Sequence, residues 1–245
     1  MNYPESLDWL FASQLHGIHL GLENIHFLLD SLHIPLTGPS ATKCIHVAGT
    51  NGKGSTSAIL EACARSAGLK TGLFTSPHLV SFRERIQINR QLISEDDVAS
   101  GLTEIRQIID ASTLQPTFFE ITTALALAHF HRSQLDLVIL ETGLGGRLDA
   151  TNVVTPLVSV ITQIDWDHQA YLGNSLPAIA LEKAGIIKPH VPVVTTPPTD
   201  EVRSLLVQIA LHRHAPISFV ATPLRNLPIA LPGDHQRWNA ALALH

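Results

Sequence analysis

Apolar and polar residues follow one another along the chain in blocks that fit strands and helices in alternation. Short, continuous apolar runs predict strands at 44–48, 71–75, 137–140, 158–164, 191–195 and 216–220, and an alternating run predicts another at 86–88. Helical spacing or composition predicts helices at 22–33, 53–68, 94–109, 119–131, 176–184 and 200–212. Because the strands are apolar on both faces, the pattern favours an α/β fold, a mostly parallel sheet flanked by helices, in one domain over residues 1–245.

The composition is typical of a folded, soluble protein. Hydrophobic residues make up 45% of the chain and charged residues 15%, and the formal net charge of -5 predicts no basic surface for nucleic acid or a membrane. No apolar run approaches the ~20 residues of a membrane-spanning helix. The two cysteines, Cys44 and Cys63, form no CxxC pair, which argues against a disulfide framework and a thiolate zinc site. We therefore expect a cytoplasmic monomer that binds neither nucleic acid nor membrane.

A glycine-rich segment lies between the first predicted strand and the helix after it. It reads VAGTNGKGST over residues 47–56, with Lys53 among the glycines and the hydroxyls of Ser55 and Thr56 behind it. Such a loop turns backbone N–H groups toward phosphate oxygens, and the helix N-terminus adds a partial positive charge. The general pattern G-x-x-x-x-G-K-[ST] is not met, because Gly54 stands where Ser or Thr belongs. We interpret the segment as the shorter phosphate loop of another family; a plain glycine-rich turn is the alternative.

Six segments follow one another in an order that is typical of one family. They read GTNGKGS at 49–55, TSPHL at 75–79, FE at 119–120, ETGLGGRLDATN at 141–152, DH at 167–168 and EKAGIIKP at 182–189. Together they resemble the folylpolyglutamate synthase and dihydrofolate synthase family, a branch of the Mur ligase superfamily. The resemblance implies the P-loop fold of the Mur ligase central domain. It also implies an enzyme that uses ATP and Mg²⁺, with two ions, to join L-glutamate to the carboxylate of a pterin substrate (dihydropteroate or a folylpolyglutamate) through an acyl phosphate.

The resemblance also implies roles for individual residues. Those expected to hold the nucleotide are Thr50, Asn51, Gly52, Lys53, Gly54, Ser55 and Asn239. Those expected to hold magnesium are Ser76, Glu141 and His168, and those expected to act in catalysis are Lys53, His168 and a carbamylated Lys183. Those expected to contact the pterin are His19, Leu20, Gly21, Leu22, Thr117, Phe118, Phe119, Glu120, Leu148, Asp149 and Ala150. Residues 1–42 would form a helical lead-in that carries part of the pterin site, and the C-terminal glutamate-binding domain of the family is not found before His245.

The residues themselves support some of these roles better than others. Glu141 ends an apolar run, and ligands of open α/β sheets bind at the carboxyl ends of strands, so a magnesium carboxylate is expected there. Chemistry alone would choose Asp165 or Asp167 over His168, because imidazole is an uncommon magnesium ligand. Lys183 is accounted for by the helix dipole, since it precedes a predicted helix end.

Arg147 and Asp149 flank Leu148 in a glycine-rich loop. Arg147 could bind a carboxylate or phosphate through two N–H groups, and Asp149 could accept a ring N–H of the pterin. The alternative is an exposed ion pair between the two, which would contribute little. Ser76 precedes Pro77, so its hydroxyl could serve metal or phosphate, or only the turn.

Two other functions stay open. A cell-wall Mur ligase that acts on a UDP-sugar peptide would share the loop and the metal, but only about 45 residues precede the loop, too few for its extra N-terminal domain. The other is a nucleotide-binding module without turnover, because the chain ends at His245 inside a helix-like run, as a truncated enzyme would. The sequence does not decide whether the parent enzyme adds the first glutamate, later ones or both.

Overall fold

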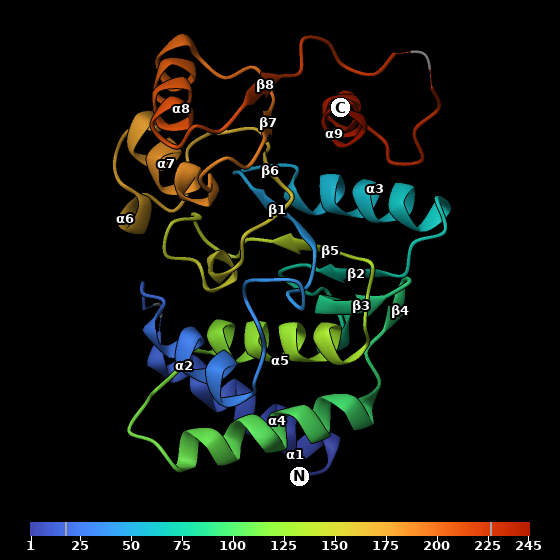
Figure 1. The fold of residues 1–245 in the computed structure, drawn as a ribbon, viewed down its shortest axis with the longest axis vertical. Helices are drawn as coiled ribbons and strands as arrows, with labels where there is room; N and C mark the ends of the chain where they lie inside the picture. Colours follow the sequence, from blue (N-terminus) through green and yellow to red (C-terminus); the bar gives the residue numbers. More distant parts are fainter. Residues whose placement is uncertain (18, 226) are drawn as a thin grey trace.

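The computed structural model describes residues 1–17, 19–225 and 227–245, and over these it forms one eight-stranded sheet in the order β4-β3-β2-β5-β1-β6-β7-β8 (Figure 1). The strands are β1 (Cys44–Ala48), β2 (Thr71–Phe74), β3 (Ile86–Ile88), β4 (Gln91–Leu92), β5 (Leu137–Glu141), β6 (Val158–Ile161), β7 (Val193–Thr195) and β8 (Ile217–Phe219). Neighbours from β2 to β8 are parallel, and β3 and β4 are antiparallel at one edge. The predicted sheet is confirmed; only the short, exposed β4 was missed, because it carries no apolar run.

Helices cover both faces of this sheet, as the pattern predicts. They are α1 (Tyr3–Ala12), α2 (Glu23–Ser31), α3 (Lys53–Ser66), α4 (Glu95–Asp110), α5 (Phe118–Arg132), α6 (Gln169–Leu172), α7 (Leu176–Lys183), α8 (Asp200–His212) and α9 (Asp234–Leu244). The 3-10 turns are η1 (Ser13–His16), η2 (Phe82–Arg85), η3 (Ala150–Val153) and η4 (Ala184–Ile186). In Figure 1, α5 lies on one side of β2 and β5 with α4 beyond it, and α3 lies on the other side with α9 packed against it. In the described part of the chain, no helix combines the length and apolar character that a membrane crossing requires.

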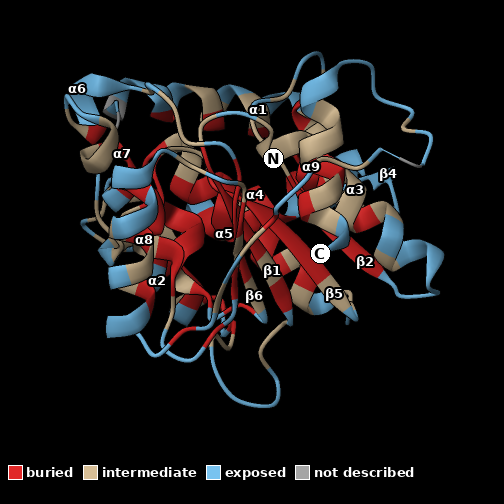
Figure 2. Ribbon diagram, turned by 90° about the horizontal axis from the view of Figure 1, so that it is seen from above, coloured by how far each residue is buried: buried red, intermediate tan, exposed pale blue. Residues whose placement is uncertain are grey.

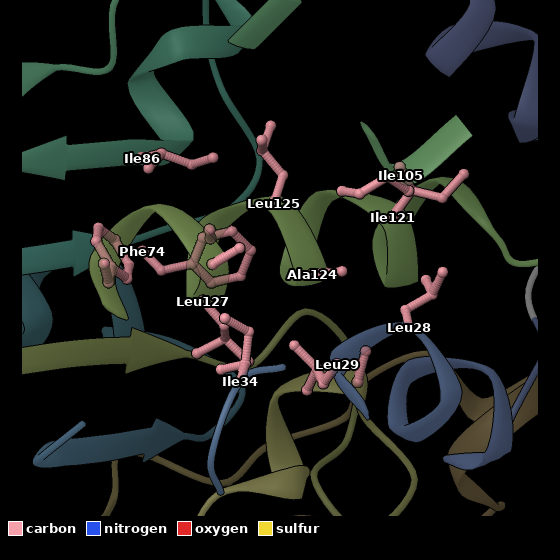
Figure 3. Packing of buried hydrophobic residues seen from close by; sticks show 14 of the residues in the cluster. Leu28, Leu29, Ile34, Phe74, Ile86, Ile105, Ile121, Ala124, Leu125 and Leu127 are labelled. Atoms are coloured by element: carbon pink, nitrogen blue, oxygen red, sulfur yellow. The ribbon is translucent and has the colours of Figure 1, made fainter. Parts of the chain in front are cut away.

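The largest core lies between the sheet and α5. Phe74 of β2 and Ile86 of β3 pack near Leu127 and Leu125 of α5, and α2 packs on α5 with Leu28 (Figure 3). All residues of α5 from 120 to 128 are buried, and the strands β1, β5 and β6 form the buried centre in Figure 2. Burial at this scale fixes α5 firmly, since each buried aliphatic side chain contributes roughly 1.5–3 kcal/mol. The start of α5 is therefore a rigid platform for the residues that it carries.

The carboxyl ends of the parallel strands share one edge of the sheet, where loops gather. The strand predicted to reach Ile164 ends at Ile161, because the chain leaves the sheet to meet the glycine-rich loop. The carbonyl of Gln163 accepts hydrogen bonds from the N–H groups of Thr50 (2.8 Å) and Asn51 (3.4 Å). This edge is where ligands of open α/β sheets bind.

Candidate active site

The glycine-rich loop after β1 adopts a backbone that only glycine tolerates at two positions. Gly49 has φ 146°, and a Cβ built on it would lie 1.8 Å from Oγ1 of Thr162. Gly52 has φ 87°, and its Cβ would lie 2.3 Å from Oδ1 of Asn239. The loop is therefore clamped between the end of β6 and α9, and Asn239 lies against it as the resemblance implied.

Lys53 begins α3, so the loop opens directly onto a helix N-terminus. Its ammonium donates to the carbonyls of Gly49 (3.0 Å) and Thr50 (3.2 Å), and thus lies over the loop. Gly54 and Ser55 form the first helical turn behind it. A mobile cation, glycine backbone and a helix N-terminus together make a binding site for phosphate oxygens.

A cavity of about 680 Å³ lies beside this loop, and we name it the loop cavity. Its lining consists of Asn51, Gly52, Ser55, Gln163, Thr196, Pro197, His235, Gln236, Trp238 and Asn239. The sequence pointed to four of these, Asn51, Gly52, Ser55 and Asn239, whereas the predicted Thr50, Lys53 and Gly54 lie outside the lining. It missed the residues after β7 and the other side chains of α9, because they share no motif with the loop and only the fold brings them to it.

Lys183 points into the core and not along the helix end. The residue is 1% exposed, and its ammonium donates to Asp167 Oδ2 (2.6 Å) and to the carbonyl of Gly49 (2.9 Å). Burial lowers the pKa of Lys183, and the charge of Asp167 opposes that shift. The helix-dipole interpretation is therefore incomplete, since the side chain ties α7 to the phosphate loop. Its carbamylation stays a prediction.

Glu141 is a buried carboxylate at the end of β5. It is 3% exposed, its Oε2 accepts the N–H of Ser76 (3.1 Å), and burial raises its pKa to about 7. A Cβ on Gly54 would lie 3.6 Å from its Oε1, so Glu141 faces the first turn of α3. In the described segments it makes no ion pair with a side-chain cation. A buried carboxylate next to a phosphate loop and a serine fits the oxygen ligands that Mg²⁺ requires.

His168 lies further out than Glu141. Its backbone is left-handed with φ 33°, its side chain is 60% exposed, and its Nε2 lies 3.7 Å from Asp167 Oδ1. Of the two aspartates that chemistry alone favoured, Asp167 accepts a hydrogen bond from Lys183, and Asp165 accepts the N–H of Trp166. The described residues contain no cluster of three His, Cys, Asp or Glu side chains suited to a metal. Ser76 and Glu141 therefore form the inner pair, with His168 at the rim.

A second cavity, of about 450 Å³, gathers most of the residues expected to contact a pterin. We name it the aromatic cavity; its lining consists of Gln14, Gly17, His19, Leu20, Gly21, Ser76, Pro77, Arg85, Thr117, Phe118, Phe119, Glu120, Gly143, Leu144, Leu148, Asp149, Ala150 and His168. Ten of the eleven predicted pterin residues are among them. Leu22 is the exception, since it packs against the apolar core at the start of α2.

Two carboxylates in the wall of the aromatic cavity are held by neutral donors. Glu120 closes a capping box at the start of α5, where its Oε2 accepts the N–H (2.7 Å) and hydroxyl (2.8 Å) of Thr117. Asp149 Oδ2 accepts the N–H groups of Gly143 and Leu144, both at 2.8 Å. Burial raises the pKa of Asp149, and these hydrogen bonds oppose that shift. These hydrogen bonds fix the orientation of both carboxylates.

A buried chain of polar groups supports Asp149 from behind. Its Oδ1 accepts the N–H (3.0 Å) and the hydroxyl of Thr151, and the same hydroxyl lies 2.8 Å from Nε2 of His46 in β1. The alternative of an ion pair between Arg147 and Asp149 is wrong, because Arg147 turns outward to Glu182 at 2.9 Å. Residues so close in sequence diverge because Asp149 caps the η3 turn.

Comparison with known proteins identifies relatives of this chain. The Mur ligase middle domain matches residues 47–221. A putative folylpolyglutamate synthase of Caenorhabditis elegans is 40% identical over 225 residues, which cover 88% of this chain and 44% of that protein. A dihydrofolate synthase/folylpolyglutamate synthase of Bacillus subtilis is 37% identical over 272 residues, which cover 99% of this chain and 62% of that protein. The chain thus spans about half the length of these two relatives.

A solved structure shares the fold along nearly the whole chain. The structure of E. coli FolC in complex with DHPP and ADP superimposes with a TM-score of 0.86 at 36% identity, and the match covers 98% of this chain and 61% of that one. The arrangement of the sheet and its flanking helices is therefore common to both proteins.

Proposed function

The chain belongs to the Mur ligase family, and we propose that it provides the ATP-binding part of a ligase that joins L-glutamate to the carboxylate of a pterin substrate. The observation that carries this proposal is the pair of cavities at one edge of the sheet. The loop beside the loop cavity has the backbone and the cation, Lys53, of a phosphate site, and the aromatic cavity has aromatic and acidic side chains suited to a ring with polar edges. The complex of the related E. coli protein with DHPP and ADP supports both assignments.

The mechanism that we propose needs no covalent bond to the enzyme. Lys53 and the N-terminus of α3 hold the phosphates of ATP and offset charge on the transferring group. An oxygen of the acceptor carboxylate bonds to the γ-phosphorus while the bond to ADP breaks. The amine of glutamate then bonds to the acyl carbon, loses a proton, and phosphate leaves. Lys183 keeps the loop in position by its bond to the carbonyl of Gly49.

Ser76 and Glu141 would hold a magnesium ion at the phosphate end, with His168 joining from the rim. The ion would supply positive charge next to the phosphate oxygens. Glu141 suits this role because its carboxylate is buried and burial raises its pKa, so a bound cation would stabilise the ionised form. A second ion, a monomeric state and a cytoplasmic location belong to the same proposal; the free thiols of Cys44 and Cys63 support the last of these.

The proposal can be tested on this chain by calorimetry with ATP and Mg²⁺, on the parent and on Lys53→Ala. We expect binding in the parent and a loss on the order of 100-fold in the variant, because the cation over the loop is removed. Phosphate release is then measured after dihydropteroate and glutamate are added. Binding without turnover would favour a nucleotide-binding piece that needs further residues for catalysis, and absence of binding would contradict the nucleotide site.

A further inference from the structure

A buried cation lines the aromatic cavity and has no part in the mechanism above. Arg85 ends the η2 turn, and only 7% of the residue is exposed. Within 1–17, 19–225 and 227–245 it is the single Lys or Arg in the wall of this cavity. Ser76, at the phosphate end of the proposed site, and Phe118 share that wall. No motif in the sequence pointed to Arg85, which belongs to a short turn.

The guanidinium of Arg85 directly contacts two neutral groups. Its Nε donates to Nδ1 of His78 at 2.7 Å, and its Cζ lies 5.2 Å from the ring centre of Phe118. Burial, followed by the charge of Arg85, lowers the pKa of His78, so this imidazole is a neutral acceptor. Among the side chains that the structure describes, no Asp or Glu forms an ion pair with Arg85.

The acids nearby do not compensate this charge. Glu120 and Asp149 line the same cavity, but their carboxylates accept hydrogen bonds from neutral N–H and hydroxyl groups. Glu141 affects Arg85 only through space, and it is the carboxylate that we assign to the magnesium ion. A buried cation without an anionic partner is strongly unfavourable, so such a group marks a place where an anion binds.

We propose that Arg85 binds the carboxylate of the acceptor substrate, an inference that rests on the proposed function. The bond from Nε to His78 leaves the two terminal nitrogens, which can bind both oxygens of one carboxylate in a planar pair. Arg85 lines the aromatic cavity, which we assign to the acceptor substrate, and not the loop cavity. Arg147, the arginine that the sequence favoured for an anion, is occupied by Glu182. Arg85 thus aligns the group that becomes phosphorylated.

The first test uses the unmodified chain and three probes in calorimetry: dihydropteroate, its carboxamide, and 6-methyl-7,8-dihydropterin, which lacks the benzoate arm. We expect dihydropteroate to bind on the order of 10- to 100-fold more tightly than the carboxamide, because only the carboxylate pairs with the guanidinium. Equal affinity for these two, with the methylpterin also binding, overturns the role of Arg85 and leaves the pterin site intact. Failure of all three to bind overturns the pterin site and this inference together.

The second test asks whether Arg85 causes the preference. In Arg85→Met the affinity for dihydropteroate should fall to about that for the carboxamide, and the affinity for the carboxamide should stay unchanged. Arg85→Lys should keep part of the preference for dihydropteroate. Arg83→Met is the matched control, because Arg83 lies in the same turn but binds Ile93 and Glu95. Its ratio of the two affinities should equal that of the parent. An unchanged ratio of the two affinities in Arg85→Met overturns the proposal. If Arg85→Met does not fold, the ratio in Arg85→Lys is compared with the ratio in the parent, and equal ratios overturn the proposal.

Discussion

The loop cavity and the aromatic cavity lie at the same edge of the sheet but are formed by different parts of the chain. The phosphate end of the loop cavity is one continuous segment, whose backbone is clamped at Gly49 and Gly52 by neighbouring elements. The aromatic cavity is lined by side chains scattered from Gln14 to His168, which the packing around α5 brings together. We therefore expect the loop cavity to lose ligand binding when its backbone is disturbed, and the aromatic cavity to lose ligand binding when a single polar side chain is removed.

The largest effect should come from Gly49→Ala, which disturbs the backbone of the loop. The new Cβ would lie 1.8 Å from Oγ1 and 3.1 Å from N of Thr162, at a φ of 146° that side chains rarely adopt. We expect a loss of about 3 kcal/mol or more in the free energy of unfolding, and no measurable ATP binding. Urea denaturation and calorimetry measure the two. Pterin affinity in protein that stays folded should change little.

Gly68→Ala is the matched control for this substitution. Gly68 also has a positive φ, 87°, but a Cβ there would meet nothing within 4 Å. It should lose only about 1 kcal/mol, the cost of the backbone conformation alone, and keep ATP binding. Equal losses in the two variants would mean that the clamp by Thr162 does not matter.

Reasoning from the residues alone predicts the phosphate loop better than the aromatic cavity, whose predicted lining came from the family resemblance, and the physical reason is the same. A phosphate loop needs a fixed order of glycines, a lysine and a helix start, all within one segment, and its departure from the general pattern pointed to one family. The direction of a side chain depends instead on packing that the sequence does not display. Arg147 and Asp149 are two residues apart and turn opposite ways, and Arg85 lies in a turn without a motif. Lys183 was placed correctly on its helix, but its burial depends on how α7 packs beside the loop.

Glu141 contacts both regions without lining either cavity, because it accepts the N–H of Ser76 and faces Gly54 of the loop. Burial raises its pKa from 4.5 to about 7 in the folded protein, so between these values the folded state holds a proton that the unfolded state has lost. Without metal, the free energy of unfolding should therefore fall as pH rises through this window, by about 3 kcal/mol at most. Denaturation of the parent and of Glu141→Gln in EDTA, at about pH 5 and about pH 7.5, isolates this contribution.

Saturating Mg²⁺ should reduce this pH dependence in the parent, because the ion favours the ionised carboxylate. It should have little effect on Glu141→Gln. A parent that shows the same pH slope as Glu141→Gln, with and without Mg²⁺, would mean that Glu141 neither resists ionisation nor binds the ion. The carboxylate would then not link the two cavities.

Lys183→Met should have a smaller effect, centred on the loop cavity. The variant removes the hydrogen bond to the carbonyl of Gly49 and leaves the carboxylate of Asp167 without its cation. We expect a loss of about 2 kcal/mol in the free energy of unfolding, and ATP affinity lowered about tenfold. A double-mutant cycle with Asp167→Asn measures the coupling; additive losses would show that the two side chains do not act as a pair.

The smallest effect should come from Thr151→Val, and it should fall on the aromatic cavity alone. The Thr151 hydroxyl has one proton and donates it to Asp149, so the 2.8 Å contact with His46 requires a proton on Nε2 of that imidazole. Burial lowers the pKa of His46 to about 3, and its Nδ1 has no partner within the described residues, which fits this neutral tautomer. ¹⁵N NMR of the parent should detect the proton on Nε2.

Without the hydroxyl, one oxygen of Asp149 loses a donor and the carboxylate is less well aimed into the cavity. Thr151→Val should therefore weaken pterin binding about tenfold, roughly 1.4 kcal/mol, and leave ATP affinity unchanged, whereas Thr151→Ser should restore the parent affinity. Calorimetry with dihydropteroate and with ATP separates the two. If Thr151→Val weakens both ligands equally, the cavities are coupled through the core, and the division between a backbone site and a side-chain site does not hold.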